Sequence, residues 1–321
     1  MLTAIHDTLA DEMARDDRVI LLGEDIGVNG GVFRVTDGLF DRFGDSRVFD
    51  MPIAESAIVG ASVGLSVAGF TPVAEIQFAG FSAQAYHQIT AQLSRLRYRS
   101  RGRFTCPVTI RAPYGGGVRT PEHHADSVEA PFVHAPGLKV VVPSTAADAR
   151  GLLTSAIRDP DPVLFLEPIA LYRRAREEVP DGENVVELGT ARVVREPGDA
   201  VIVAWGAMVD VACAAADLVA QRRGASVGVV DLRTLSPLDV DTLTRVAEEA
   251  GRVVVVHEAP LTAGFGAEVV ATIQESAFFS LEAPIARVGS YDLPGPVPTI
   301  EDWCRPDAAS VATAVERTLD A

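Results

Sequence analysis

The chain has few cysteines, and their spacing suits neither a metal site nor a disulfide framework. Among its 321 residues only Cys106, Cys213 and Cys304 are cysteines, and no two form a CxxC pair. Small secreted domains have dense cysteine patterns, whereas isolated cysteines are typical of proteins from reducing compartments. The first residues, MLTAIHDTLADEMARD, predict an amphipathic helix rather than a signal peptide. We therefore expect a cytoplasmic protein.

Positive charge is also scarce. The sequence has 28 Lys and Arg residues against 44 Asp and Glu residues, which gives a formal net charge of −16. Binding to nucleic acid or to an anionic membrane needs a basic surface. The composition thus argues against both of these partners and suits a basic protein partner.

Long apolar runs are absent, apart from one uncharged segment between Glu55 and Glu75. Its length approaches that of a membrane span, but serines and glycines dilute its hydrophobicity, and no basic cluster flanks it. A better interpretation is a buried helix over residues 54–68, a turn at Gly69 and a buried strand over 71–77. Gly60 and Gly64, four residues apart, would let this helix lie close to another backbone.

Nucleotide-binding motifs are missing too. The segment YGGGV at 114–118 follows an expected strand, but no GK[ST] comes after it. The segment GFG at 264–266 opens an expected helix, but Val269 occupies the place of the third glycine of a dinucleotide fingerprint. We expect both segments to be tight turns with positive φ.

What the sequence does contain is an alternation of β-rich apolar runs with helical patterns, which predicts parallel sheets covered by helices. Expected strands are 19–22, 71–77, 108–111, 139–142 and 163–166, then 200–205, 226–231 and 252–257. Expected helices are 54–68, 82–97 and 146–158, then 209–222, 240–249, 266–276 and 308–319. A polar stretch at 173–184 separates the two series. The predicted fold class is α/β, with two parallel-sheet domains.

Several polar residues follow the expected strands, where open parallel sheets place their ligands. They are Glu24, Asp25, Gln77, His257 and Glu258. Each can equally cap a helix or bind loop backbone.

A loop at 120–130, TPEHHADSVEA, combines two histidines with three carboxylates. Such a loop suits proton transfer, or it is a surface loop whose His123 and His124 meet solvent. A zinc site is less well supported, because all its ligands would come from one short loop.

Glu55 stands at the mouth of the uncharged segment. A carboxyl group shielded from water is held protonated, or bonded to a ligand rather than to solvent. Helix capping is the alternative explanation for this residue.

From about Leu2 to Leu319 the sequence resembles the beta subunits of the thiamine-diphosphate-dependent decarboxylating component of 2-oxo acid dehydrogenase complexes. The resemblance rests on LLGEDIG, GGVFRVTDGL, FGDSRVFDMPIAESAIVGASVGLSVAGFTPVAEIQF, LRYRS, VTIRAPYGGG, HAPGLKVVVPS, DARGLLTSAIRDPDPVLFLEP, VVDLRTLSPLD and VVVVHEA. It implies a transketolase-like chain with a pyrimidine-binding domain over 1–175, a linker over 176–188 and a transketolase C-terminal-like domain over 189–321.

The resemblance gives Glu55 a role. In this family the glutamate of the P-x-A-E-S motif hydrogen-bonds a ring nitrogen of the cofactor's aminopyrimidine and favours its imino tautomer. Ile53, Gln77 and Phe81 align with positions lining the pyrimidine and substrate pocket. Phe81 takes a place where branched-chain relatives can carry tyrosine.

His124 aligns with the active-site histidine of the family's H-S-Q-S motif, which assists acyl transfer to a lipoyl group. Here the motif reads HADS, so Ala125 and Asp126 replace Ser and Gln. We hypothesise that Asp126 holds the imidazole as a cation.

The family's diphosphate motif, GDG followed by a distant asparagine, is missing from this chain. The resemblance therefore implies an alpha subunit that holds diphosphate and Mg²⁺, an α2β2 assembly with thiamine diphosphate shared between subunits, and a lipoyl-acyltransferase core as further partner. The glycine-containing helix is either a contact between subunits or packed within the chain. A potassium site in the family corresponds here to Val108, Thr109, Ala156, Asp159 and Asp161.

Substrate choice rests on short blocks. The sequences SVEA at 127–130 and EPIALYR at 167–173 look more like branched-chain enzymes, although Ile169 departs from a common lysine. We expect branched-chain 2-oxo acids as substrates, with pyruvate or acetoin as the alternative. A non-catalytic scaffold subunit is the alternative from another class, and the presence of both Glu55 and His124 argues against it.

Overall fold

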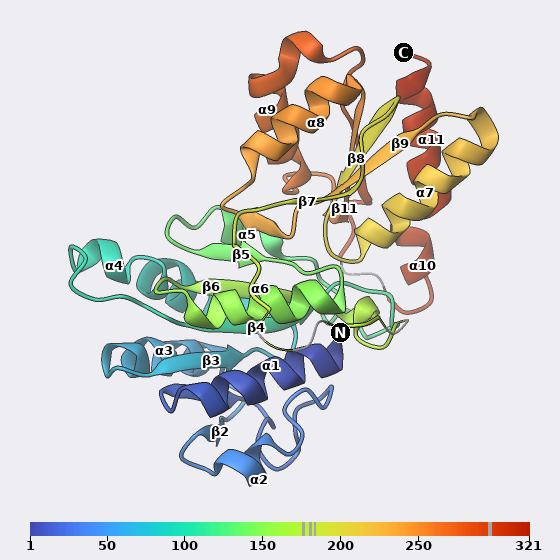
Figure 1. Ribbon diagram of the computed structural model, residues 1–321. Helices are drawn as coiled ribbons and strands as arrows, with labels where there is room; N and C mark the ends of the chain where they lie inside the picture. Colours follow the sequence, from blue (N-terminus) through green and yellow to red (C-terminus); the bar gives the residue numbers. More distant parts are fainter. Residues whose placement is uncertain (175–176, 180–181, 183, 295–296) are drawn as a thin grey trace. The chain divides into compact units, whose positions relative to one another are not determined.

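The computed structural model describes residues 1–174, 177–179, 182, 184–294 and 297–321 (Figure 1). The chain forms two compact units. The first comprises Met1–Tyr114 and Pro131–Leu188, and the second comprises Gly115–Ala130 and Gly189–Ala321. The segment 115–130, which the sequence analysis assigns to the first domain, thus groups with the second unit. The expected linker at 176–188 lies in part outside the described residues.

The first unit is built on parallel strands in the order β5-β6-β4-β3-β1-β2. The strands are β1 (Val19–Gly23), β2 (Val48–Asp50), β3 (Thr71–Glu75), β4 (Thr109–Tyr114), β5 (Lys139–Val141) and β6 (Val163–Pro168). The helices are α1 (Leu2–Arg15), α2 (Leu39–Phe43), α3 (Glu55–Val67), α4 (Leu96–Arg99) and α6 (Ala146–Arg158), and α5 (Glu129–Val133) begins at the end of segment 115–130. Shorter helical turns are η1 (Ala79–Ala85), η2 (Gln88–Leu93) and η3 (Ile169–Leu171).

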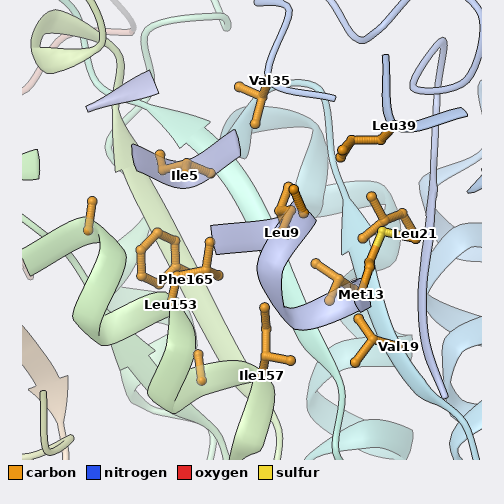
Figure 2. Close-up of a cluster of buried hydrophobic side chains, with 14 of the residues drawn as sticks. Ile5, Leu9, Met13, Val19, Leu21, Val35, Leu39, Leu153, Ile157 and Phe165 are labelled. Atoms are coloured by element: carbon orange, nitrogen blue, oxygen red, sulfur yellow. The ribbon is translucent and has the colours of Figure 1, made fainter. Parts of the chain in front are cut away.

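The core of the first unit lies between α1, α6 and the sheet. Ile5, Leu9 and Met13 of α1 are four residues apart, so they share one helix face, and all three are fully buried. Figure 2 shows these side chains in one buried cluster with Leu153 of α6 and Phe165 of β6. This packing fixes the strands whose carboxyl ends carry the candidate site.

The second unit holds a five-stranded sheet in the order β12-β11-β8-β9-β7. Its strands are β7 (Arg192–Arg195), β8 (Ala200–Ala204), β9 (Val227–Asp231), β11 (Val253–Pro260) and β12 (Ala286–Ser290), and the unit also contains β10 (Thr234–Ser236). Its helices are α7 (Met208–Arg223), α8 (Val240–Ala250), α9 (Gly266–Ala277), α10 (Glu301–Cys304) and α11 (Ala308–Leu319), with the short turn η4 (Phe278–Ser280). Strand β7 pairs with β9 in antiparallel orientation, and the other pairs are parallel.

The α/β fold expected from the sequence is confirmed, with two local corrections. The helix expected over 82–97 is instead η1, the π-helix η2 and the short α4. The Ser94 N–H bonds to the Ile89 carbonyl, five residues back rather than four, which is the wider turn of a π-helix.

The second correction concerns α3, which is buried on one face only. Ile58, Val59 and Ser62 are buried, but Gly64 and Val67 are exposed. A Cβ added at Gly64 would have no atom within 4 Å. Gly64 therefore does not serve close packing within this chain, whereas a Cβ at Gly60 would meet the Gln88 side chain at 3.8 Å. Among the helices of the described residues, none combines the length and hydropathy of a membrane span.

Candidate active site

Glu55 is the first residue of α3, and its side chain is 7% exposed. The residue before it, Ala54, has no side chain that could cap the helix. The carboxylate of Glu24 instead accepts the backbone N–H of Ala54. A carboxylate in the first helical turn also interacts favourably with the helix dipole. Two segments of the chain thus combine to hold Glu55 at the helix start.

Glu24 follows β1 and is the site residue to which sequence reasoning gave no role. Its side chain is 5% exposed, and its Oε1 has no hydrogen-bond partner within the described chain. Burial, together with the nearby charges of Glu55 and Asp25, raises the pKa of Glu24. Its position at the carboxyl end of a strand was the available signal. In the structure, its charge interacts with that of Glu55.

Gln77 and Phe81 follow β3, the strand that pairs directly with β1. The Phe81 ring makes an edge contact with Phe78 at 5.8 Å between centroids, and Phe78 makes another with Phe33 at 5.5 Å. Gln77 and Phe81 are both half-buried. Ile53, two residues before Glu55, is 86% exposed and available to a ligand or a partner. The first unit therefore places two carboxylates and an aromatic row at the carboxyl ends of β1 and β3.

A buried ion network supports these strand ends. Arg111 on β4 binds Glu167 on β6 through two hydrogen bonds and Glu75 on β3 through one, at 2.7, 3.0 and 2.8 Å. The hydroxyl of Tyr172 donates to Glu167. Burial raises the pKa of Glu75 and, more strongly, that of Tyr172, so the tyrosine stays neutral. The network joins three neighbouring strands just before Gln77, since Ile76 N–H donates to the Arg111 carbonyl at 2.9 Å.

His124 belongs to the second unit, in the loop after β4. Its Nδ1 lies 3.0 Å from the carbonyl oxygen of Glu122. The carboxylate of Asp126, expected to hold His124, lies 2.7 Å from Nδ1 of the neighbouring His123. Ala125, in place of the family's serine, is buried.

The glycines at 115–117 and those at 264–266 are required for different reasons. Gly115 and Gly117 have φ of +76° and +99°, as expected for the first segment. Gly264 and Gly266 do not have positive φ, so that expectation is wrong. They lie against the buried imidazole of His257, where an added Cβ would come within 2.7 Å of the ring. His257 stacks on Trp205 at 5.4 Å, so the missing side chains make room for this stack.

The residues of the expected potassium site meet where β4, the end of α6 and the turn before β6 adjoin. Val163 N–H donates to the Val108 carbonyl. The carboxylates of Asp159 and Asp161 bind Lys139 and Arg97. The Thr109 hydroxyl is buried and has no hydrogen-bond partner in the described chain. Within that same part of the chain, no group of three or more His, Cys, Asp or Glu residues could hold a metal ion. A cation here would therefore rest on hydroxyl and carbonyl oxygens.

Known protein families and individual relatives match this chain over nearly its whole length. The transketolase pyrimidine binding domain family matches residues 1–174, and the transketolase C-terminal domain family matches residues 189–311. The chain is 51% identical over 320 residues to the pyruvate dehydrogenase E1 component subunit beta of Bacillus subtilis (strain 168), covering 100% of this chain and 98% of the relative. It is 49% identical, with the same coverage, to the protein of that name from Staphylococcus aureus (strain N315).

Solved structures agree on the fold. A split gene transketolase, described as an inactive beta4 tetramer, superposes with a TM-score of 0.79 at 26% identity and covers 99% of this chain and 97% of its own. Transketolase from Leishmania mexicana gives a TM-score of 0.71 at 19% identity, over 99% of this chain and 45% of its own. This chain belongs to the beta subunits of the thiamine-diphosphate-dependent decarboxylating component of 2-oxo acid dehydrogenases.

Proposed function

We propose that this chain is the beta subunit of a cytoplasmic pyruvate dehydrogenase. Together with an alpha subunit it would decarboxylate pyruvate oxidatively and pass the acetyl group to the lipoyl group of an acyltransferase core. The observation that carries the chemistry is the buried Glu55 at the first turn of α3, beside Glu24. The observation that carries the substrate is 51% identity with a pyruvate dehydrogenase beta subunit along the whole chain.

The residues at the first site fit thiamine diphosphate. A protonatable ring requires a carboxyl group shielded from water, which Glu55 supplies, and a flat ring requires an aromatic wall, which Phe81 supplies. When bound, the cofactor supplies the nucleophilic carbon that attacks the 2-oxo group. Glu55 would hold a proton at the aminopyrimidine ring nitrogen, and Ile53, Gln77 and Phe81 would line the ring and the substrate.

His124 would act in the second half of the reaction. Acyl transfer to a thiol requires a side chain that gives or takes a proton, and an imidazole is the usual one. The bond between its Nδ1 and the Glu122 carbonyl holds one edge of the ring. Asp126 binds the neighbouring His123, and its expected effect on His124 stays a prediction that the pH profile of Asp126→Asn would test.

The remaining cofactor contacts are divided between chains. We place diphosphate and Mg²⁺ on the alpha subunit, because this chain has no GDG motif followed by the family's asparagine. We place K⁺ at the Thr109 hydroxyl and the neighbouring carbonyls of Val108 and Ala156. The unpartnered, buried hydroxyl of Thr109 supports this assignment.

The open face of α3 supports an assembly of the α2β2 type. Gly64 and Val67 of α3 are exposed in this chain, although no residue between Glu55 and Glu75 carries a charge. An uncharged face with small side chains suits close contact with another helix. We assign this face to a contact with another subunit.

We propose pyruvate as the substrate, in place of the branched-chain 2-oxo acids that short sequence blocks predicted. The relatives are named as pyruvate dehydrogenases along the whole chain, and such breadth outweighs the four residues at 127–130. Ile169, where branched-chain enzymes commonly have lysine, agrees with this preference. A small pocket gains about 1–3 kcal/mol of discrimination per methylene, so some activity on larger acids is expected.

The test is a substrate comparison in the assembled enzyme. The chain, purified with its alpha subunit, thiamine diphosphate and Mg²⁺, should show kcat/KM for pyruvate roughly tenfold or more above that for 3-methyl-2-oxobutanoate. The reverse order would restore the branched-chain assignment. Glu55→Ala should nearly abolish turnover on either acid while the assembly still forms. Full activity in that variant would remove Glu55 from the mechanism, and absence of all activity in the wild type would favour a scaffold subunit.

A further inference from the structure

The loop that carries His124 has little apolar anchoring, since Ala125 is small and Val118 is exposed. It runs from Gly115 to Asp126, and the Gly115 N–H closes it by donating to the Asp126 carbonyl at 3.3 Å. Most of its residues between Gly117 and His123 are exposed, and Val118 is 45% exposed. A cavity of about 320 Å³ is lined in part by Glu122, His123, Ala125 and Asp126 of the loop. Hydrophobic packing therefore contributes little to its conformation.

Two carboxylates hold the backbone of the loop instead, and Asp302 binds the Arg119 side chain at its surface. Glu258 at the end of β11 accepts the N–H of Gly116 at 2.6 Å. Glu301, the first residue of α10, accepts the N–H of Gly117 with one oxygen and that of Arg119 with the other, the latter at 2.7 Å. Glu301 is 1% exposed. Backbone N–H groups that converge in this way form a concave anion site, filled here by side chains of the same unit.

The glycines of the loop are required by this arrangement. A Cβ on Gly116 would collide with the Glu301 carboxylate, and one on Gly115 would lie 3.1 Å from a Glu258 oxygen. The positive φ at Gly115 and Gly117 aims successive N–H groups to one side. The glycine-rich segment thus binds carboxylates rather than phosphates.

A positive charge lies beside these carboxylates. Arg305, at the end of α10, donates to Glu258 at 2.8 Å, and α10 also supplies Glu301, so both anchors belong to one connected group. Bonds from backbone N–H groups to ionised carboxylates are stronger than neutral ones. Removing one carboxylate would leave the N–H groups of the loop free to move.

We propose that Glu258 and Glu301 are positioning residues for His124, which fix the loop for acyl transfer to the lipoyl group. The proposal rests on the role given to His124 under the proposed function. It predicts that loss of either carboxylate lowers acyl transfer more than decarboxylation, because the loop carries the residue of the second step.

The test uses the assembled enzyme with cofactor and compares Glu301→Ala, Glu301→Gln and Glu275→Ala. Glu275 is exposed on α9 and serves as the matched control. Hydrogen exchange at residues 116–119 should be faster in Glu301→Ala and unchanged in the control. Reductive acetylation of a free lipoyl domain should fall on the order of 10- to 100-fold in Glu301→Ala. The rate of decarboxylation, measured with an artificial oxidant, should also be compared. Its loss factor should be at least about ten times smaller than the loss factor of acetyl transfer. Glu301→Gln keeps one acceptor oxygen and should recover part of the transfer rate.

Equal losses in both half-reactions, or unchanged exchange at residues 116–119, would overturn the proposal. If Glu301→Ala does not assemble, Gly116→Ala displaces the same carboxylate and should give the same split. His124→Gln is the reference for the proposed function. Should that variant transfer acetyl normally, the role of His124 fails, while the exchange data still decide whether the carboxylates hold the loop.

Discussion

Arg111 binds Glu167 through two parallel hydrogen bonds inside the first unit, at 2.7 and 3.0 Å. The Arg111 and Glu167 side chains are 2% and 0% exposed, and the same guanidinium also binds Glu75. A buried charge left without its partner is costly. Arg111 therefore joins β4 to β3 and β6 near their carboxyl ends, next to Gln77.

Arg111→Met should destabilise the chain by about 3–5 kcal/mol, because it leaves Glu75 and Glu167 buried without a cation. Urea denaturation followed by circular dichroism measures the change. Arg18→Met is the control, since Arg18 pairs with Asp16 on the surface. Equal midpoints for the two variants would show that the buried network contributes no more than a surface pair.

Glu24→Gln should become progressively more stable than the wild type as the pH rises above 4.5, the ordinary value for glutamate. Burial and Glu55 raise the pKa of Glu24 in the folded chain. The stability of the wild type that depends on the protonated form is therefore complete below pH 4.5 and is lost as the pH rises through the folded-state pKa. Glutamine stays neutral and can still accept the Ala54 N–H.

Urea midpoints of both proteins across this pH range measure the effect. A difference between them that does not vary with pH would contradict a raised pKa of Glu24 in the folded chain.

Trp205 should report the ionisation of Glu129. Its indole N–H donates to Glu129 Oε1 at 3.3 Å, and burial raises the pKa of that carboxyl to about 7. Tryptophan fluorescence should therefore change with a midpoint near pH 7. Because the ionised form of Glu129 is disfavoured inside the fold, the free energy of unfolding falls as the pH rises from 4.5, the ordinary value for glutamate, to about 7.

Trp303, the other tryptophan, is 69% exposed and should first be replaced by phenylalanine. In that background Glu129→Gln should abolish the transition. Persistence of the transition would assign it to another group.

Gly266→Ala should destabilise the chain, although alanine is the better helix former. Its Cβ would come within 2.7 Å of the His257 imidazole, which is fully buried against Trp205. Overpacking of a core of this kind costs about 1–3 kcal/mol. In Gly64→Ala, where no atom lies within 4 Å, the helix propensity should instead give a gain of up to about 1 kcal/mol. Thermal unfolding of the two variants compares them directly, and a stabilised Gly266→Ala would contradict the packing argument.

Gly64→Leu tests the proposed subunit contact of α3. The isolated chain has open space at this position and should fold as the wild type does. Assembly with the alpha subunit should be weakened, because a close helix contact has no room for a leucine. Size-exclusion chromatography of the co-expressed subunits measures this. Normal assembly would move the contact to another surface.

Much of the fold could be predicted because its signals are local. Helix α6 and helix α11 have the bounds that their periodicity predicts, and most strands agree within a few residues. Strand β7 was missed because all four of its residues are only half-buried and give no strong pattern. The helix expected over 82–97 is wrong because the chain there forms 3₁₀ and π turns, such as the Ser94 N–H bond to the Ile89 carbonyl, and apolar periodicity does not distinguish these turns from an α-helix.

By itself the sequence determined the α/β class, the family, and the choice of Glu55 and His124 as candidate residues. These follow from periodicity and from motifs that lie within short stretches of chain. Only the tertiary structure decided that Glu24 supports Glu55, and that Glu258 and Glu301 hold Gly116 and Gly117 from 142 and 184 positions away. Such contacts depend on where distant segments meet after folding, and no local pattern encodes that meeting.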